Sequence, residues 1–97
     1  MFEISFSRKS RKSLKRLSKS GQFDERSVSD VIRTLATGKS LEARHQNHTL
    51  HGEYADCFEC HIKNDLLLIY KIHEEKRLLS IVDIGSHSDL FEWVGRN

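Results

Sequence analysis

The 97-residue sequence is poor in cysteine and lacks a long apolar segment. Cys57 and Cys60 are its only cysteines, too few for the disulfide framework that holds small secreted domains together. The longest uninterrupted apolar run covers residues 66–70, far short of the roughly 20 residues that a membrane-spanning helix needs. The basic amino terminus is not followed by the apolar core of a signal peptide. We therefore expect a soluble, cytoplasmic protein with free thiols and no membrane partner.

Acidic residues are nearly absent from the first fifth of the sequence. Residues 1–20 carry seven Lys or Arg against the single acid Glu3, a net charge of +6, whereas the remainder carries −4. No repeat, linker or low-complexity tract divides the chain, and its length suits one compact domain. We expect a single domain over residues 1–97, with its positive charge concentrated at the amino-terminal end.

Apolar spacing predicts one strand and two helices in the first half. Residues 2–6 alternate between apolar and polar, which is typical of a strand with one buried face. Ser7 can cap a helix that follows this strand. Asp24 can cap a second helix, whose apolar residues repeat at i, i+3, i+4 and i+7 until Gly38. This second helix is expected to be the main core helix, and the polar residues 39–53 are expected to form a loop.

Three further strands are expected in the second half. Residues 58–62 alternate in polarity, a turn signal follows, and residues 66–72 are nearly all apolar, which together predict a hairpin. Residues 78–84 form the next strand, and a short turn or helix closes the chain. The order β-α-α-β-β-β predicts an α+β domain in which two helices pack on a mostly antiparallel sheet.

Histidine is frequent, with six in the chain, and strand alternation predicts where the histidines gather. If the apolar residues of the 58–62 strand face the helices, Glu59 and His61 face the opposite side. Asp65 at the turn and His48 in the preceding loop can join them there. Near neutral pH, imidazole both accepts and donates protons, so this cluster can deprotonate a ribose 2′-hydroxyl and protonate the departing 5′-oxygen without a metal.

Such a reaction also needs positive charge beside the cluster. A cation must balance the negative charge that develops on the reacting phosphate. The sequence does not choose among four candidates, which are Lys63, Lys71, Arg44 and Arg77.

Three segments resemble the YafQ-like branch of the RelE toxin superfamily: HTLHGEY at 48–54, ECHIKNDLLLIYK at 59–71 and GSHSDLF at 85–91. The resemblance implies a RelE-like fold and the toxin of a type II toxin–antitoxin system. It implies a ribosome-dependent messenger RNA endonuclease that uses 2′-hydroxyl attack, leaves a 2′,3′-cyclic phosphate and needs no cofactor. It further implies inhibition by a DinJ-type antitoxin, with the toxin monomeric alone and heterotetrameric in the complex.

The family motifs assign roles to individual residues. The Gly-Ser-His motif puts the principal catalytic histidine, a general acid, at His87, and the Leu-Phe that follows puts an aromatic substrate contact at Phe91. The His-x-Leu-x-Gly motif supplies His48. The carboxylate-x-His-x-x-x-Asp pattern supplies His61 and Asp65. Lys63, Arg44 and Lys71 are kept as the cations that bind substrate.

Two positions depart from the family's pattern. Glu59 stands where the first carboxylate is usually Asp. Asp83 stands where the family usually has Arg, so a cation near the scissile phosphate has become an anion. An acid there is expected to repel RNA phosphate and to favour the protonated form of His87, unless Arg44 or Lys63 compensates.

A zinc site is an alternative interpretation of the histidines and cysteines. His45, His48 and His51 recur at intervals of three, and Cys57 and Cys60 follow, a spacing at which such ligands can bind zinc. The two cysteines differ by an odd number of positions, however, so on a regular strand they point to opposite faces. We therefore expect no metal, buried cysteines, and solvated loop positions for His45 and His51.

The first predicted helix has a cationic face. At 100° per residue its basic side chains fall within an arc of roughly 160°, with Leu14 and Leu17 opposite. Like charges without interleaved acids favour a polyanionic partner, which the resemblance implies to be ribosomal RNA. An acidic antitoxin segment is a second occupant of the same surface. The cations are Arg8, Lys9, Arg11, Lys12, Lys15, Arg16 and Lys19.

Two functions of different classes remain open. The first is a messenger RNA endonuclease. The second is a binding module, a toxin relic weakened by Asp83 that still docks on the ribosome or antitoxin without cutting. Substitution of His87 by Ala separates them, since only an enzyme loses its effect while retaining antitoxin affinity.

Overall fold

A computed structural model describes residues 1–21, 23–50 and 52–91. At its centre is a five-stranded sheet with the order β1-β5-β4-β3-β2. β1 runs parallel to β5, and every other pair of neighbours is antiparallel, which confirms the expected α+β class and mostly antiparallel sheet. The strands are β1 (Glu3–Phe6), β2 (His48–Thr49), β3 (Phe58–Lys63), β4 (Leu66–His73) and β5 (Leu78–Gly85).

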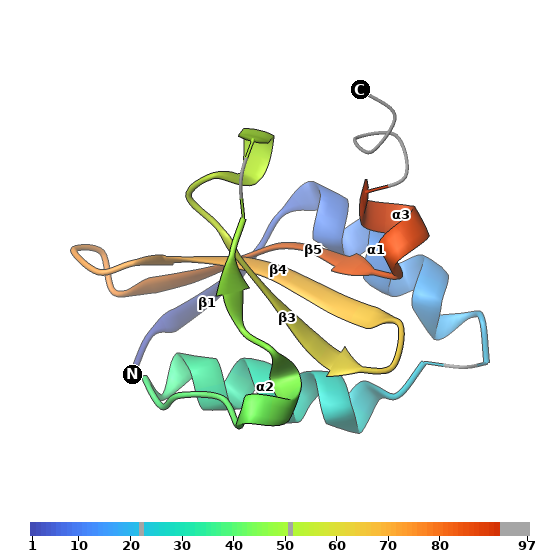
Figure 1. Cartoon of the computed structure of the whole chain (residues 1–97), viewed down its shortest axis with the longest axis horizontal. Helices are drawn as coiled ribbons and strands as arrows, with labels where there is room; N and C mark the ends of the chain where they lie inside the picture. Colours follow the sequence, from blue (N-terminus) through green and yellow to red (C-terminus); the bar gives the residue numbers. More distant parts are fainter. Residues whose placement is uncertain (22, 51, 92–97) are drawn as a thin grey trace.

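Helices lie on both sides of this sheet. α2 covers one face of the sheet, and α3 lies over the other face (Figure 1). α1 packs along β5. No helix in the described ranges is both long enough and apolar enough to cross a membrane. The α-helices are α1 (Arg8–Ser18), α2 (Glu25–Ala36) and α3 (His87–Phe91), and the short 3-10 helices are η1 (Ala43–His45) and η2 (Gly52–Tyr54).

The two long helices begin at the capping residues that the sequence predicts. Ser7 Oγ accepts a hydrogen bond from the Ser10 backbone N–H at 2.9 Å, and Asp24 accepts one from the Ser27 N–H at 3.1 Å. Each bond satisfies a backbone donor that has no partner within its own helix. Gly38, with φ of 82°, takes the left-handed conformation that ends α2.

The main core lies between α2 and the sheet. The four apolar positions expected to line α2 are all buried, as are Cys60 and Ile62 of β3. A second cluster on the opposite face contains Cys57, Leu67 of β4 and Leu90 of α3. The two cysteines therefore occupy opposite faces, as their spacing predicts, and burial raises the pKa of the Cys60 thiol to about 12. The four α2 positions are Val28, Val31, Ile32 and Leu35.

Three local expectations differ from the structure. Ile4 is 41% exposed, because β1 is the edge strand and pairs only with β5. α1 buries Ser10 and Ser13 against the sheet, whereas the leucines expected to form its apolar contact are only half-buried. The expected loop at 39–53 contains β2 and η1, elements too short to show a periodic signal.

Candidate functional site

The site face of the sheet is the one opposite α2. Alternation along β3 sends Cys60 and Ile62 to the α2 core and turns Glu59 and His61 to the site face, as the sequence predicts. The Glu59 side chain is only 5% exposed, and its Oε1 lies 3.8 Å from His61 Nε2. A buried carboxylate thus stands directly beside a partly exposed imidazole.

His48 joins this pair because β2 adds to the edge of β3. His48 is the direct cross-strand partner of Glu59, and its Nε2 lies 3.2 Å from Glu59 Oε1. Its Nδ1 lies 2.7 Å from the carbonyl oxygen of Gln46. Both ring nitrogens therefore face oxygen acceptors, and the ring donates through both of them when it is protonated.

His87 enters the site from the start of α3. Asp65 at the β3–β4 turn accepts a hydrogen bond from the His87 backbone N–H at 3.0 Å, and its Oδ1 lies 3.2 Å from His87 Nδ1. The backbone hydrogen bond, with a smaller contribution from the ring, holds the pKa of Asp65 below its ordinary value. A charged carboxylate therefore orients the histidine ring through Nδ1.

Together these side chains form a row of three imidazoles, His48, His61 and His87, which we call the histidine row. The ring centroids of His48 and His61 are 6.5 Å apart, and those of His61 and His87 are 5.8 Å apart. Glu59 lies between the first two rings, and Asp65 contacts the third. The structure thus brings together all five residues expected to be catalytic.

Two of the cations expected to bind substrate lie elsewhere. Lys63 Nζ is 2.7 Å from Asp24 Oδ2 at the start of α2, and its hydrogen bond holds the pKa of Asp24 well below its ordinary value. A register shift between His61 and Lys63 interrupts the alternation that would have placed both on one face. Arg44, 3.3 Å from Glu42, lines the hollow between α2 and η1. Neither is placed at the histidine row.

Lys71 does project from the site face, on the same side of β4 as Leu67 and Ile69. Its Nζ is 3.9 Å from Asp56 Oδ2. Arg77, in the turn before β5, stacks over the ring of Phe2 with 5.1 Å to the centroid. The expected aromatic contact, Phe91, ends α3, and its side chain lies outside the described part of the structure. His51 likewise lies outside the described residues.

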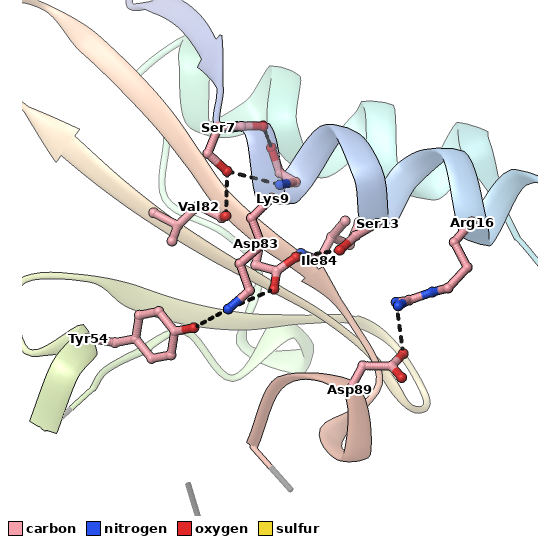
Figure 2. Close-up of polar contacts among 10 residues, drawn as sticks. Ser7, Lys9, Ser13, Arg16, Tyr54, Val82, Asp83, Ile84 and Asp89 are labelled. Carbon is pink, nitrogen blue, oxygen red and sulfur yellow. Dashed lines mark hydrogen bonds and ion pairs between the residues drawn. The ribbon is translucent and has the colours of Figure 1, made fainter. Parts of the chain in front are cut away.

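Asp83 is not the surface acid that the sequence suggests. It lies on the site face two strands from Glu59, since it pairs with Ile69, which pairs with Glu59. Its side chain is 3% exposed, and its Oδ1 accepts hydrogen bonds from Ser13 Oγ at 2.7 Å and from the Ile84 N–H at 2.8 Å (Figure 2). The prediction that this carboxylate faces an RNA phosphate is wrong, because α1 covers it.

Lys9 and Tyr54 contact each other on this face, a contact that the sequence did not predict. Lys9 Nζ lies 3.0 Å from the Tyr54 hydroxyl and 3.7 Å from Asp83 Oδ2, so it connects η2 with β5 (Figure 2). On the same helix, Arg16 Nη2 lies 3.3 Å from Asp89 Oδ2 of α3. The six cations of α1 and Lys19 at its carboxyl-terminal cap are all exposed, as expected, but Lys9 and Arg16 also reach the site face. Nothing in the sequence distinguishes Lys9 and Arg16 from the neighbouring cations, because their ion-pair partners lie on distant elements.

His45 also departs from expectation. It is 8% exposed, and its Nδ1 lies 2.6 Å from the carbonyl oxygen of His61. The expectation of a solvated loop residue is therefore wrong, because η1 packs the ring against β3. In the described ranges, no three His, Cys, Asp or Glu side chains gather closely enough to hold a metal ion.

Comparisons with known proteins agree over nearly the whole chain. The model of a family described as bacterial toxins of type II toxin–antitoxin systems, YafQ, matches residues 2–92. No curated protein sequence gives a match.

Among solved structures, a metal-bound toxin from Helicobacter pylori is 42% identical, with a TM-score of 0.86 over 94% of this chain and 100% of its own. YafQ in the DinJ–YafQ complex from Escherichia coli is 25% identical, with a TM-score of 0.82 over 94% and 99% of the two chains. YafQ from E. coli strain BL21(DE3) is 24% identical, with a TM-score of 0.85 over 94% and 99%, a likeness of fold.

Proposed function

Because this chain belongs to the YafQ family of toxins of bacterial type II toxin–antitoxin systems, we propose that it is a ribosome-dependent messenger RNA endonuclease. The observation that carries the proposal is the histidine row with Glu59 and Asp65 on the face of the sheet opposite α2. Cleavage of RNA through its own 2′-hydroxyl needs one group that removes a proton and another that donates one. The row supplies both types of group without a bound metal.

The reaction divides between the two ends of the row. The group of His48, Glu59 and His61 removes the proton of the 2′-hydroxyl, whose oxygen then forms a bond to phosphorus. The bond from phosphorus to the 5′-oxygen breaks, and His87 donates a proton to that leaving oxygen. The products are a 2′,3′-cyclic phosphate and a 5′-hydroxyl, so no water or cofactor is consumed in this step.

Asp65 is the positioning residue for His87. Its carboxylate lies at Nδ1 of the ring, which favours a proton on Nδ1 and assigns proton transfer to Nε2. The carboxylate also places a negative charge directly beside the ring. The low pKa of Asp65 keeps this charge in place throughout the physiological range of pH.

The cations of α1 suit the proposal of a ribosome-dependent enzyme. The exposed face of this helix offers positive charges to ribosomal RNA, whose phosphates bind such surfaces without reading sequence. Docking on the ribosome would align the messenger with the histidine row, which lowers the entropic cost of the reaction. We place this single-domain toxin, acting without a metal cofactor, in the cytoplasm, where its substrate lies.

A DinJ-type antitoxin is the proposed inhibitory partner. The E. coli relative forms a complex with DinJ, and its chain superposes on nearly all of this one. We further propose that the free toxin is a monomer and that the complex is a heterotetramer. Mass measurement of the co-expressed pair by light scattering tests this stoichiometry.

Primer extension on messenger RNA in a purified translating system tests the activity. We expect cuts within codons at the ribosomal A site, and their loss with His87→Ala. Circular dichroism and antitoxin binding of the variant serve as controls for its fold. Absence of cuts by the wild-type protein at high concentration, with ribosome binding intact, would leave the binding module as the function.

The same system tests metal independence. The wild-type protein should cut equally well after treatment with a chelator of zinc and copper that spares the magnesium of the ribosome. Loss of cutting that returns with either metal contradicts a metal-free mechanism.

The buried position of Asp83 removes one argument for the alternative function, a toxin relic that no longer cuts. Its carboxylate faces α1 and not the substrate.

A further inference from the structure

The proposed reaction requires a cation that the histidine row itself lacks. The attack on phosphorus places additional negative charge on the non-bridging oxygens of the phosphate, and enzymes stabilise such charge with fixed donors or cations. Lys63 and Arg44 are held on the α2 side, and Arg77 stacks on Phe2 in the turn before β5. Lys71 does lie on the site face, where its Nζ is 3.9 Å from Asp56 Oδ2. Helix α1 brings further cations to the same face.

α1 supplies such a cation at its first turn. Lys9 and Arg16 are seven positions apart, so they lie on the same side of the helix. That side adjoins the buried Ser13 and looks across β5 (Figure 2). Arg16 Nη2 lies 3.3 Å from Asp89 Oδ2 of α3, and Lys9 Nζ lies 3.7 Å from Asp83 Oδ2, which is longer than an ordinary hydrogen bond. Lys9 is thus held near an acid without a direct hydrogen bond to it.

Two elements hold Lys9 in place. Asp83 Oδ1 is occupied by Ser13 and the Ile84 N–H, which leaves Oδ2 facing the ammonium. From the other direction, the Tyr54 hydroxyl lies 3.0 Å from Nζ. The hydrogen bond with Tyr54, and more weakly the charge of Asp83, raise the pKa of Lys9 against the opposing effect of partial burial. The side chain remains 55% exposed, so substrate can reach it.

We propose that Lys9 is the phosphate-binding cation of this site, an inference that rests on the proposed nuclease function. An ammonium has three donors, and the contact with Tyr54 uses one of them, so others remain to meet non-bridging oxygens. Asp83 lies two strands from Glu59, which at about 4.8 Å per strand is about 10 Å of backbone separation. Glu59 and Asp83 both lie on the site face, with Ile69 of β4 between them, so Lys9 and the histidine row face the same side of the sheet.

The test is single-turnover cleavage of messenger RNA on purified ribosomes, at saturating toxin. Lys9→Met should lower the maximal rate on the order of 100-fold, the loss typical for removal of one group that stabilises developing charge. Lys9→Arg retains the charge and should restore most of the rate. Lys76→Met, which removes an exposed lysine in the turn before β5, is the matched control and should cut like wild type.

A double variant separates substrate binding from a structural role. Lys9→Met leaves a buried carboxylate uncompensated, which can disturb the fold by itself. Adding Asp83→Asn removes that charge while keeping an oxygen for Ser13 and Ile84. The double variant should regain the wild-type melting temperature and still cut slowly. If it cuts at the wild-type rate, Lys9 only neutralises Asp83, and the inference is wrong.

The two proposals fail in different ways. A wild-type protein that never cuts overturns the nuclease itself. Cutting that depends on His87 but is unchanged in Lys9→Met leaves the nuclease standing and overturns only the role of Lys9.

Discussion

The two faces of the sheet differ in the side chains that they carry and in how deeply these are buried. On one face, α2 closes over apolar side chains such as Leu68 and Ile81, which are almost completely buried. On the other, Glu59 is buried while His48 and His87 remain about half exposed. The same strand β3 contributes to both, because its side chains alternate. The larger apolar core therefore lies on one face, and the histidine row lies on the other beside a smaller apolar cluster. Substitutions in the larger core and in the histidine row should therefore have separate effects on stability and on cleavage.

The largest effect is expected at the centre of the histidine row. His61→Ala should lower the cleavage rate by roughly 100- to 1,000-fold, since a proton-transfer group is lost. The melting temperature should change little, because the ring faces the open side of β3. Cleavage kinetics and calorimetry on the same preparations check this. A variant that unfolds while retaining its rate per folded molecule would reverse the assignment of the two faces.

A substitution on the α2 face should do the opposite. Leu68→Ala removes a side chain that is 0% exposed, and should reduce the free energy of unfolding by about 3 kcal/mol. Urea denaturation measures this change. At low temperature, where the variant remains folded, cutting per folded molecule should match wild type. A large loss of rate in the folded variant contradicts the separation of the faces.

Asp65→Asn sharpens the comparison within the site. Loss of the carboxylate at His87 Nδ1 should slow cutting roughly tenfold and shift its dependence on pH. The folded-state pKa of Asp65 lies below its ordinary value of 3.8, so its stabilising effect is present above that pH and is lost as the pH falls further. Wild type should lose more stability than Asp65→Asn on acidification below about pH 4. Parallel acid unfolding curves would exclude this linkage.

The smallest effect concerns the attachment of α1 to the site face. Ser7→Ala removes both the cap of α1 and the hydrogen bond from Ser7 Oγ to the Val82 carbonyl at 2.6 Å. We expect a loss of about 1 kcal/mol in unfolding free energy. Ser18→Ala, at the exposed end of the helix, is the control and should change stability much less. Equal losses of unfolding free energy in the two variants would show that the Ser7 cap does not contribute specifically to stability.

Local patterns predicted most of the fold and the residues of the histidine row. Asp24 and Gly38 mark α2 because capping and left-handed backbone are properties of single residues. Alternation along β3 predicted that Glu59 and His61 share a face, since the period of a strand is two. β2 escaped prediction because a two-residue strand is defined by its partner, not by its own sequence.

The sequence by itself determined the order of the two long helices and the four longer strands, the core face of α2, and the side of β3 that carries the acid and the imidazole. These follow from interactions within a few residues. Tertiary structure alone decided that Lys63 joins Asp24, that His45 is buried behind β3, and that Lys9 lies over Asp83. A charged side chain is long and flexible, so its partner depends on which distant elements the fold brings within reach. That is why the similar cations of α1 acquired different surroundings.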